Sequence, residues 1–148
     1  MTSAKLTAAL AFCLGMAPAA KSATELSHEH HSVQAATVPV PAHRWASDAP
    51  LRDGMRRVHA ALGDLREYEV GRMSEDMALE RVAAIESATA YMFANCKLPP
   101  EPDAALHGML ASLLAGTAAL RADPKDMTSV ARMRNAVADY PIYFDDPR

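Results

Sequence analysis

Four apolar stripes with helical spacing run through the chain from residue 51 onward, and they constrain its fold more than any other feature. Each stripe steps by three or four residues, so its members share one face of an α-helix. No alternation of period two stands out, so strands are not expected. The four stripes are Leu51, Met55, Val58, Leu62 and Leu65; Val82, Ile85, Thr89, Met92 and Cys96; Leu106, Leu110, Leu113, Thr117 and Leu120; and Val130, Met133, Val137, Tyr140 and Phe144.

Proline and capping residues occupy the breaks between the stripes. The run Leu98–Pro102 contains three prolines, which lack the amide hydrogen and must end the second helix. Asp123–Pro124 is expected to open the fourth helix as cap and first-turn proline. Pro141 must then disturb or end that helix, which leaves residues 142–148 as a packed tail. The other boundary signals are Ser47, Asp48 and Pro50 before the first helix, Gly71 after it, and Ser74 before the second.

The fold class follows from the number of these helices and the length of their connections. Short connections make consecutive helices antiparallel neighbours. The sequence therefore predicts an all-α, up-down-up-down four-helix bundle over residues 45–148. Hydrophobic residues make up 50% of the chain and aromatic residues only 5%, a composition that suits helices with small side chains at close contacts. A chain of 148 residues is expected to form one domain.

The first 44 residues are expected to lie outside the bundle. Lys5, followed by the apolar run Leu6–Met16 and then by small residues, has the pattern of a secretory signal peptide, which we expect over residues 1–22. The run is too short to cross a membrane, and no further membrane span is expected. Residues 23–44 show no helical or strand period and are expected to form a disordered linker, whose HEHH motif at residues 28–31 can collect divalent metal weakly. The sequence therefore predicts a periplasmic protein.

Net charge and cysteine content narrow the function classes. The formal net charge of -3 argues against nucleic-acid binding, which requires a basic face. Cys13 would leave with the signal peptide, so Cys96 has no partner for an internal disulfide. A catalytic pair of Cys96 and His107 would need a lowered thiol pKa and an oxyanion site, and the end of a helix has the wrong dipole sign for that purpose. We therefore do not expect an enzyme.

The predicted topology brings a candidate metal site together at one end of the bundle. There the first helix begins, the second ends and the third begins. Thioether, thiolate and imidazole groups from these positions form a ligand set that favours copper over zinc. The candidate ligands are Met55, Cys96 and His107, with His59 and Met92 in reserve and Asp48, Asp103 and Asp145 as possible hydrogen-bond partners of the imidazole. The first function predicted is a periplasmic carrier or homeostasis protein for a metal ion, with copper favoured.

The same residues have a second interpretation as ordinary packing. Met55 and Cys96 would then fill core positions, and His107 would be half exposed with a hydrogen-bonded ring. The protein would then be a non-enzymatic helical bundle that binds an unknown periplasmic protein. A b-type haem between Met55 and His107 is a third, less favoured interpretation, and the lack of a Cys-x-x-Cys-His motif excludes covalently attached haem.

Three spaced motifs carry a resemblance to a known group of proteins. They are Trp45-x-x-Asp48-x-x-Leu51-Arg52-x-Gly54-Met55, Cys96-Lys97-Leu98-x-Pro100-x-x-Asp103-x-x-Leu106-His107, and Tyr140 with Phe144-Asp145. From Trp45 onward the chain resembles small exported proteobacterial helical proteins that carry the label DnrO and have a His-rich leader. The resemblance implies export, a helical domain and attention to Met55, Cys96, Asp103 and His107, but no particular activity. Those proteins tend to end Phe-Asp-His-Pro-Gly-Trp, whereas this chain ends Phe144-Asp145-Asp146-Pro147-Arg148, so it lacks the histidine of that motif.

Overall fold

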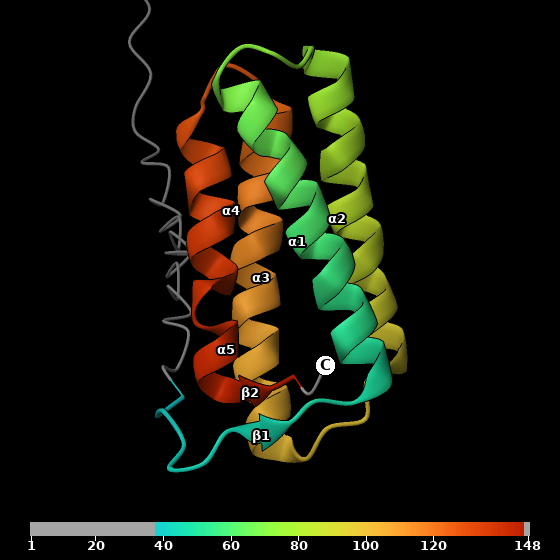
Figure 1. Ribbon diagram of the computed structural model, residues 1–148, viewed down its shortest axis with the longest axis vertical. Coiled ribbons are helices and arrows are strands. Elements are labelled where there is room, and N and C mark those ends of the chain that lie inside the picture. The colour runs from blue at the N-terminus through green and yellow to red at the C-terminus, as the bar shows by residue number, and fades with distance from the viewer. Residues whose placement is uncertain (1–37, 147–148) are drawn as a thin grey trace, which may run out of the picture. The chain divides into compact units, whose positions relative to one another are not determined.

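Residues 38–146 are described by a computed structural model, and most of them lie in helices (Figure 1). The expected signal peptide, the linker up to residue 37, and residues 147 and 148 fall outside the described part. The elements in chain order are β1 (Trp45–Ala46), α1 (Ala49–Glu69), α2 (Glu75–Asn95), α3 (Pro100–Ala122), α4 (Thr128–Ala138), α5 (Tyr140–Tyr143) and β2 (Phe144–Asp145). The prediction of a mostly helical protein with four main helices is confirmed.

The core forms where the apolar stripes of α1 to α4 meet, together with Tyr140 of α5 and Phe144 of β2. α1 packs against α2 and α3 packs against α4, with further contacts between α2 and α3 and between α1 and α4. Every predicted stripe residue except Cys96 is buried, and several, such as Leu65, Ile85 and Leu110, are 0% exposed. Removal of this apolar surface from water is the main favourable term in folding. The stripes predicted from the sequence are therefore the core of the protein.

Two methionines pack onto glycines of a neighbouring helix. Met92 of α2 lies against Gly54 of α1, and Met133 of α4 lies against Gly116 of α3. A β-carbon on either glycine would overlap the methionine side chain. Each glycine therefore allows the two helices of its pair to approach closely, with the methionine filling the gap.

Three helix boundaries predicted from the sequence are confirmed by local geometry. The Asp48 carboxylate caps α1 by accepting the N–H of Leu51 at 2.8 Å. The Ser74 hydroxyl caps α2 by accepting the N–H of Met77 at 3.3 Å. Gly71, in the turn between these helices, has a φ of 72°, a left-handed conformation that glycine adopts without a steric penalty.

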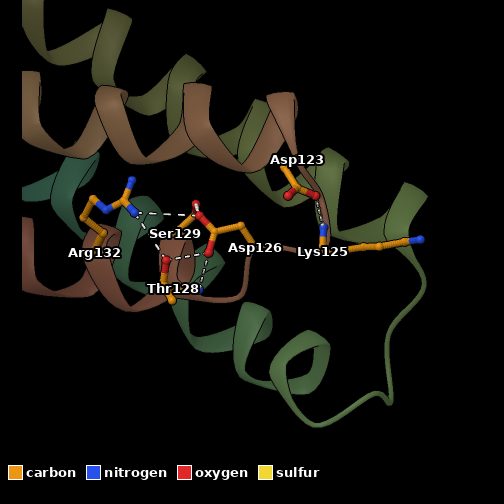
Figure 2. A network of polar contacts seen from close by, with 6 residues as sticks. All are labelled: Asp123, Lys125, Asp126, Thr128, Ser129 and Arg132. Atoms are coloured by element: carbon orange, nitrogen blue, oxygen red, sulfur yellow. Dashed lines mark hydrogen bonds and ion pairs between the residues drawn. The ribbon is translucent and has the colours of Figure 1, made fainter.

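α4 begins at Thr128, later than the sequence predicts, so the expected cap at Asp123 is wrong. Figure 2 shows that Asp126 organises this start: its carboxylate accepts the N–H of Thr128 and the hydroxyl of Ser129, both at 3.0 Å. Asp123 instead accepts the N–H of Lys125 at 3.0 Å within the preceding turn. Asp126 accepts more hydrogen bonds than Asp123 does, because two hydroxyl groups lie beside it.

The C-terminal segment forms a strand pairing that the sequence did not predict. β2 runs parallel to β1, with Trp45 opposite Phe144. The Ser47 hydroxyl donates to the carbonyl of Asp145 at 2.6 Å, and the ring of Trp45 stacks on that of Tyr143 with 5.8 Å between centroids. Strands of two residues are too short to leave an alternating pattern, so this pairing depends on the packing around it.

The described part of the expected linker contacts the helices. Val38 packs against the core. Its carbonyl accepts a hydrogen bond from the Tyr143 hydroxyl at 2.7 Å. This bond ties the segment before β1 to α5.

α3 is the most apolar of the described helices. It has 23 residues, and an 18-residue window within it has a mean hydropathy of 1.3. By length and composition it could therefore cross a membrane. A core helix of a globular protein has the same properties, and 39% of that window is buried inside the protein, against α2 and α4. The expectation that the mature chain has no membrane span stays a prediction.

Candidate functional site

Asp48 joins the beginning of α1 to the loop that follows α2. One oxygen of its carboxylate caps α1, and the other accepts the N–H of Lys97 at 2.7 Å. Lys97 directly follows Cys96, which is the C-cap residue of α2. The carboxylate therefore holds Cys96 beside the first turn of α1.

Cys96 is a half-buried thiol in a negatively charged environment. Its backbone N–H donates to the carbonyl of Met92 at 2.9 Å, the last such bond of α2. Burial raises the pKa of the thiol, followed by the charge and hydrogen bond of Asp48 and the charge of Asp103, and together they bring this pKa to about 12. The thiol is therefore protonated at neutral pH, which is the opposite of what a cysteine nucleophile requires.

His107 is oriented by α3 and by α2. Its Nδ1 lies 2.9 Å from the backbone carbonyl of Asp103 and 3.4 Å from the carboxylate of the same residue. Because a carbonyl can only accept, this bond assigns the proton to Nδ1 and leaves the lone pair on Nε2. The ring also packs against that of Phe93, with 4.9 Å between centroids. The side chain of His107 is exposed. Its Nε2 is the nitrogen that can bind a metal.

Cys96 and His107 lie at the same end of the helices and share Asp103 as a neighbour. The charge of Asp103 acts on the thiol of Cys96, and its carboxylate approaches the imidazole. Asp48, considered above as a partner of the imidazole, contacts the thiol and Lys97. Within residues 38–146, no group of three or more His, Cys, Asp or Glu residues is arranged to hold a metal ion.

The two methionines considered as ligands are part of the core. Met55 is 1% exposed and Met92 is 0% exposed. The side chain of Met92 is engaged by Gly54 of α1. A metal that used either thioether would have to bind beneath the surface, at the expense of core packing.

The reserve ligand His59 and the third acidic residue, Asp145, contact other residues. The ring of His59 meets that of Tyr140 edge-on, with 6.4 Å between centroids. Asp145 pairs with Arg44 at 3.2 Å. Neither residue has a described contact that joins it to the thiol.

His59 lines a groove between α1, α4 and α5 that the sequence analysis missed. The α1 residues that line it include Arg56, His59, Gly63 and Arg66. Their spacing of three, four and three residues places them on one face of the helix. That spacing was visible in the sequence, but a polar helical face ordinarily faces solvent and carries no signal of its own.

Comparison of the chain with protein-family models, with curated proteins and with solved structures found no match. The resemblance to the DnrO-labelled proteins stays an expectation from the motifs. Function must therefore be inferred from the chemistry of the described residues.

Proposed function

We propose that this protein is a periplasmic metal-binding protein that carries or buffers copper as Cu(I), with Cys96 and His107 as the primary ligands. The observation that supports it best is the surroundings of the Cys96 thiol. Burial and the carboxylates of Asp48 and Asp103 hold this thiol protonated, with a pKa of about 12. A bound cation would offset the two negative charges and replace the proton, so the same surroundings favour a metal thiolate.

Ligand chemistry favours Cu(I) among the cations that could bind here. Thiolate and imidazole are soft and borderline ligands, which suit Cu(I). The proton on Nδ1 of His107 leaves Nε2 as the donor nitrogen, and the Asp103 carbonyl that accepts this proton orients the ring. Met55 is a candidate third ligand, and its burial makes its contribution a separate question.

We also propose the signal peptide and the bundle topology that the sequence predicts. Residues 1–22 would be removed as a signal peptide, and the four long helices would form an up-down-up-down bundle with the metal at one end. Export would place the lone Cys96 in an oxidising compartment, where binding to a metal protects a thiol from oxidation.

An anaerobic Cu(I) titration against a chromophoric chelator tests the proposal. The chain is used from residue 23 onward, and every protein carries alanine in place of the histidines at positions 28, 30 and 31, which lie outside the described residues. We expect one equivalent of Cu(I), lost in Cys96→Ser and weakened at least about tenfold in His107→Asn, because each change removes one ligand. Met55→Leu reports separately whether the thioether contributes.

His59→Asn is the matched control, since it removes an imidazole that lies against Tyr140 and not beside Asp103. It should leave Cu(I) affinity unchanged. Circular dichroism must show that each variant keeps its helical content. Equal affinity of the parent, Cys96→Ser and His107→Asn proteins would refute the copper proposal.

Copper affinity should also rise with pH in a defined way. Because the free thiol is protonated at neutral pH, binding as a thiolate releases one proton. The affinity should therefore increase about tenfold per pH unit between about pH 6 and pH 8. A pH-independent affinity would show that Cys96 is not the ligand.

The second candidate function is that of a non-enzymatic interaction protein, in which Cys96 and His107 are packing residues. The exposed ring of Phe93 beside His107 favours it, because Phe93 is 43% exposed on the same end of the molecule. In that case Phe93→Ala would abolish binding to a periplasmic partner, while the Cu(I) titration would show no specific site.

A further inference from the structure

The groove between α1, α4 and α5 is a second candidate site within residues 38–146. Its volume is about 870 Å³, within the range of small-molecule sites. Neither Cys96 nor Lys97 lines the groove, which has its own set of ionisable side chains. They are Arg44, Arg56, His59, Arg66, Arg134 and Asp146.

Gly63 keeps the α1 side of the groove open. A β-carbon added to Gly63 would meet nothing within 4 Å, in contrast to Gly54 and Gly116, which are in contact with methionines. Glycine inside a helix costs about 1 kcal/mol relative to alanine. No neighbouring atom requires a glycine at position 63. The lack of a side chain there leaves the groove open on the α1 side, next to Arg66.

The floor of the groove is apolar. It includes Leu62, Val137 and the aromatic residues Tyr140 and Phe144, all of them at most 4% exposed. The rings of Tyr140 and Phe144 stack with 5.3 Å between centroids and an angle of 20°. An apolar body placed in the groove would therefore lie against a rigid surface that the core already supports.

The rim of the groove carries four arginines, three of which pair with carboxylates. Arg134 is held by Glu69 through two hydrogen bonds, one of them 2.8 Å long, and Arg44 and Arg56 pair with Asp145 and Asp53. Within residues 38–146, Arg66 has no ion-pair partner. Arg66 therefore gives the lining a positive charge without a carboxylate partner, which is complementary to an anion.

We propose that this groove binds a small amphipathic anion: an apolar aromatic or aliphatic body with a carboxylate or sulfonate group. The body lies over Leu62, Val137 and Tyr140, and the anionic group pairs with Arg66 at the rim. Guanidinium groups match planar or branched oxyanions in geometry and charge. This site is independent of the copper proposal, because it uses neither Cys96 nor His107.

Anilinonaphthalene sulfonate and its uncharged analogue N-phenyl-naphthylamine, which share an aromatic body, test the proposal by fluorescence titration of the full mature chain. We expect one molecule of the sulfonate to bind, about tenfold or more tightly than the uncharged analogue. Arg66→Gln should weaken the sulfonate about three- to tenfold and leave the uncharged analogue unchanged, because only the charge contact is lost. Gly63→Phe should weaken both probes at least about tenfold by filling the groove.

Two matched variants serve as controls. Gly108→Phe places the same side chain at the other helical glycine whose β-carbon would meet nothing within 4 Å, and Lys125→Gln removes an exposed cation outside the groove. Both should bind the sulfonate as the parent does, with unchanged thermal unfolding. Equal binding of the two probes, or equal loss in Gly63→Phe and Gly108→Phe, would overturn the proposal. Cys96→Ser should keep sulfonate binding, so failure here and failure of the copper site are distinguishable.

Discussion

At the scale of single residues, Asp48 does the most to shape the candidate metal site. Its two oxygens accept the N–H of Leu51 and the N–H of Lys97. The same carboxylate raises the pKa of Cys96 through its charge and a hydrogen bond. A residue that the sequence marks as a helix cap is thus also the main electrostatic neighbour of the thiol.

Asp48→Asn should lower the pKa of Cys96 from its value of about 12. Asparagine is an equally good helix cap, so α1 should stay intact while the negative charge is lost. The rate of alkylation by iodoacetamide, measured against pH, should rise at lower pH than in the parent. Loss of the Lys97 hydrogen bond should cost about 1 kcal/mol of stability.

Asp64→Asn is a suitable control, because Asp64 pairs with Arg81 at 2.9 Å and is not among the groups that act on the thiol. Its alkylation profile should match that of the parent. Identical profiles for Asp48→Asn and the parent would contradict the assigned role of Asp48.

The raised pKa of Cys96 also sets how the stability of the protein depends on pH. Since the folded-state pKa lies above the ordinary value of 9.0, the stabilising contribution is complete below pH 9 and declines as the pH rises towards 12.

At the scale of secondary-structure elements, the helical glycines have different functions that the structure separates. Gly54 and Gly116 allow close contact within the pairs α1–α2 and α3–α4. Gly63 faces open space in the groove. The sequence shows four glycines in the described helices without distinguishing them, because the difference lies in the neighbouring helix.

Alanine at these positions should change stability in opposite directions. Gly54→Ala and Gly116→Ala should lower the free energy of unfolding by about 1–3 kcal/mol, because the new methyl group displaces Met92 or Met133. Gly63→Ala should raise it by about 0.5–1 kcal/mol through its higher helix propensity. Urea unfolding followed by circular dichroism measures all three. A change of the same sign at all three positions would show that the assigned contacts are wrong.

At the scale of the whole molecule, the contact between the segment before α1 and the C-terminal segment closes one end of the helices. β1 pairs with β2, and Trp45 packs on Tyr143 and Phe144 with 5.8 Å between centroids in each case. These contacts join residues about a hundred positions apart in the chain, as in the hydrogen bond from Ser47 to Asp145, a separation of 98. They add long-range contacts to helices whose own backbone hydrogen bonds are local.

Trp45→Ala should therefore lower stability without a large loss of helix. We expect the free energy of unfolding to fall by about 1–3 kcal/mol, since a partly buried aromatic side chain loses its contacts. Phe93→Ala, at an exposed aromatic residue, should cost less than about 1 kcal/mol and serves as the control. Urea titrations of both variants decide the point, and an equal effect of the two changes would argue against a closing role for Trp45.

The sequence by itself determined the helices and their buried faces. Leu51 to Leu65 and the other three stripes could be read directly, because an apolar face repeats every three to four residues whatever lies opposite it. Asp48, Ser74 and Gly71 could also be assigned, since caps and left-handed turns depend on neighbours a few residues away. Cys96 and His107 could be placed at one end, because short loops make adjacent helices antiparallel.

Only the tertiary structure decided the contacts between distant segments. It placed Asp48 beside Cys96, turned the thioether of Met92 towards Gly54, and left Gly63 facing an open groove. It also assigned the start of α4 to Asp126 and paired β1 with β2. Apart from the Asp126 cap, whose contacts are local, none of these features has a periodic or local signal, because each depends on which side chains from other elements come within a few ångströms.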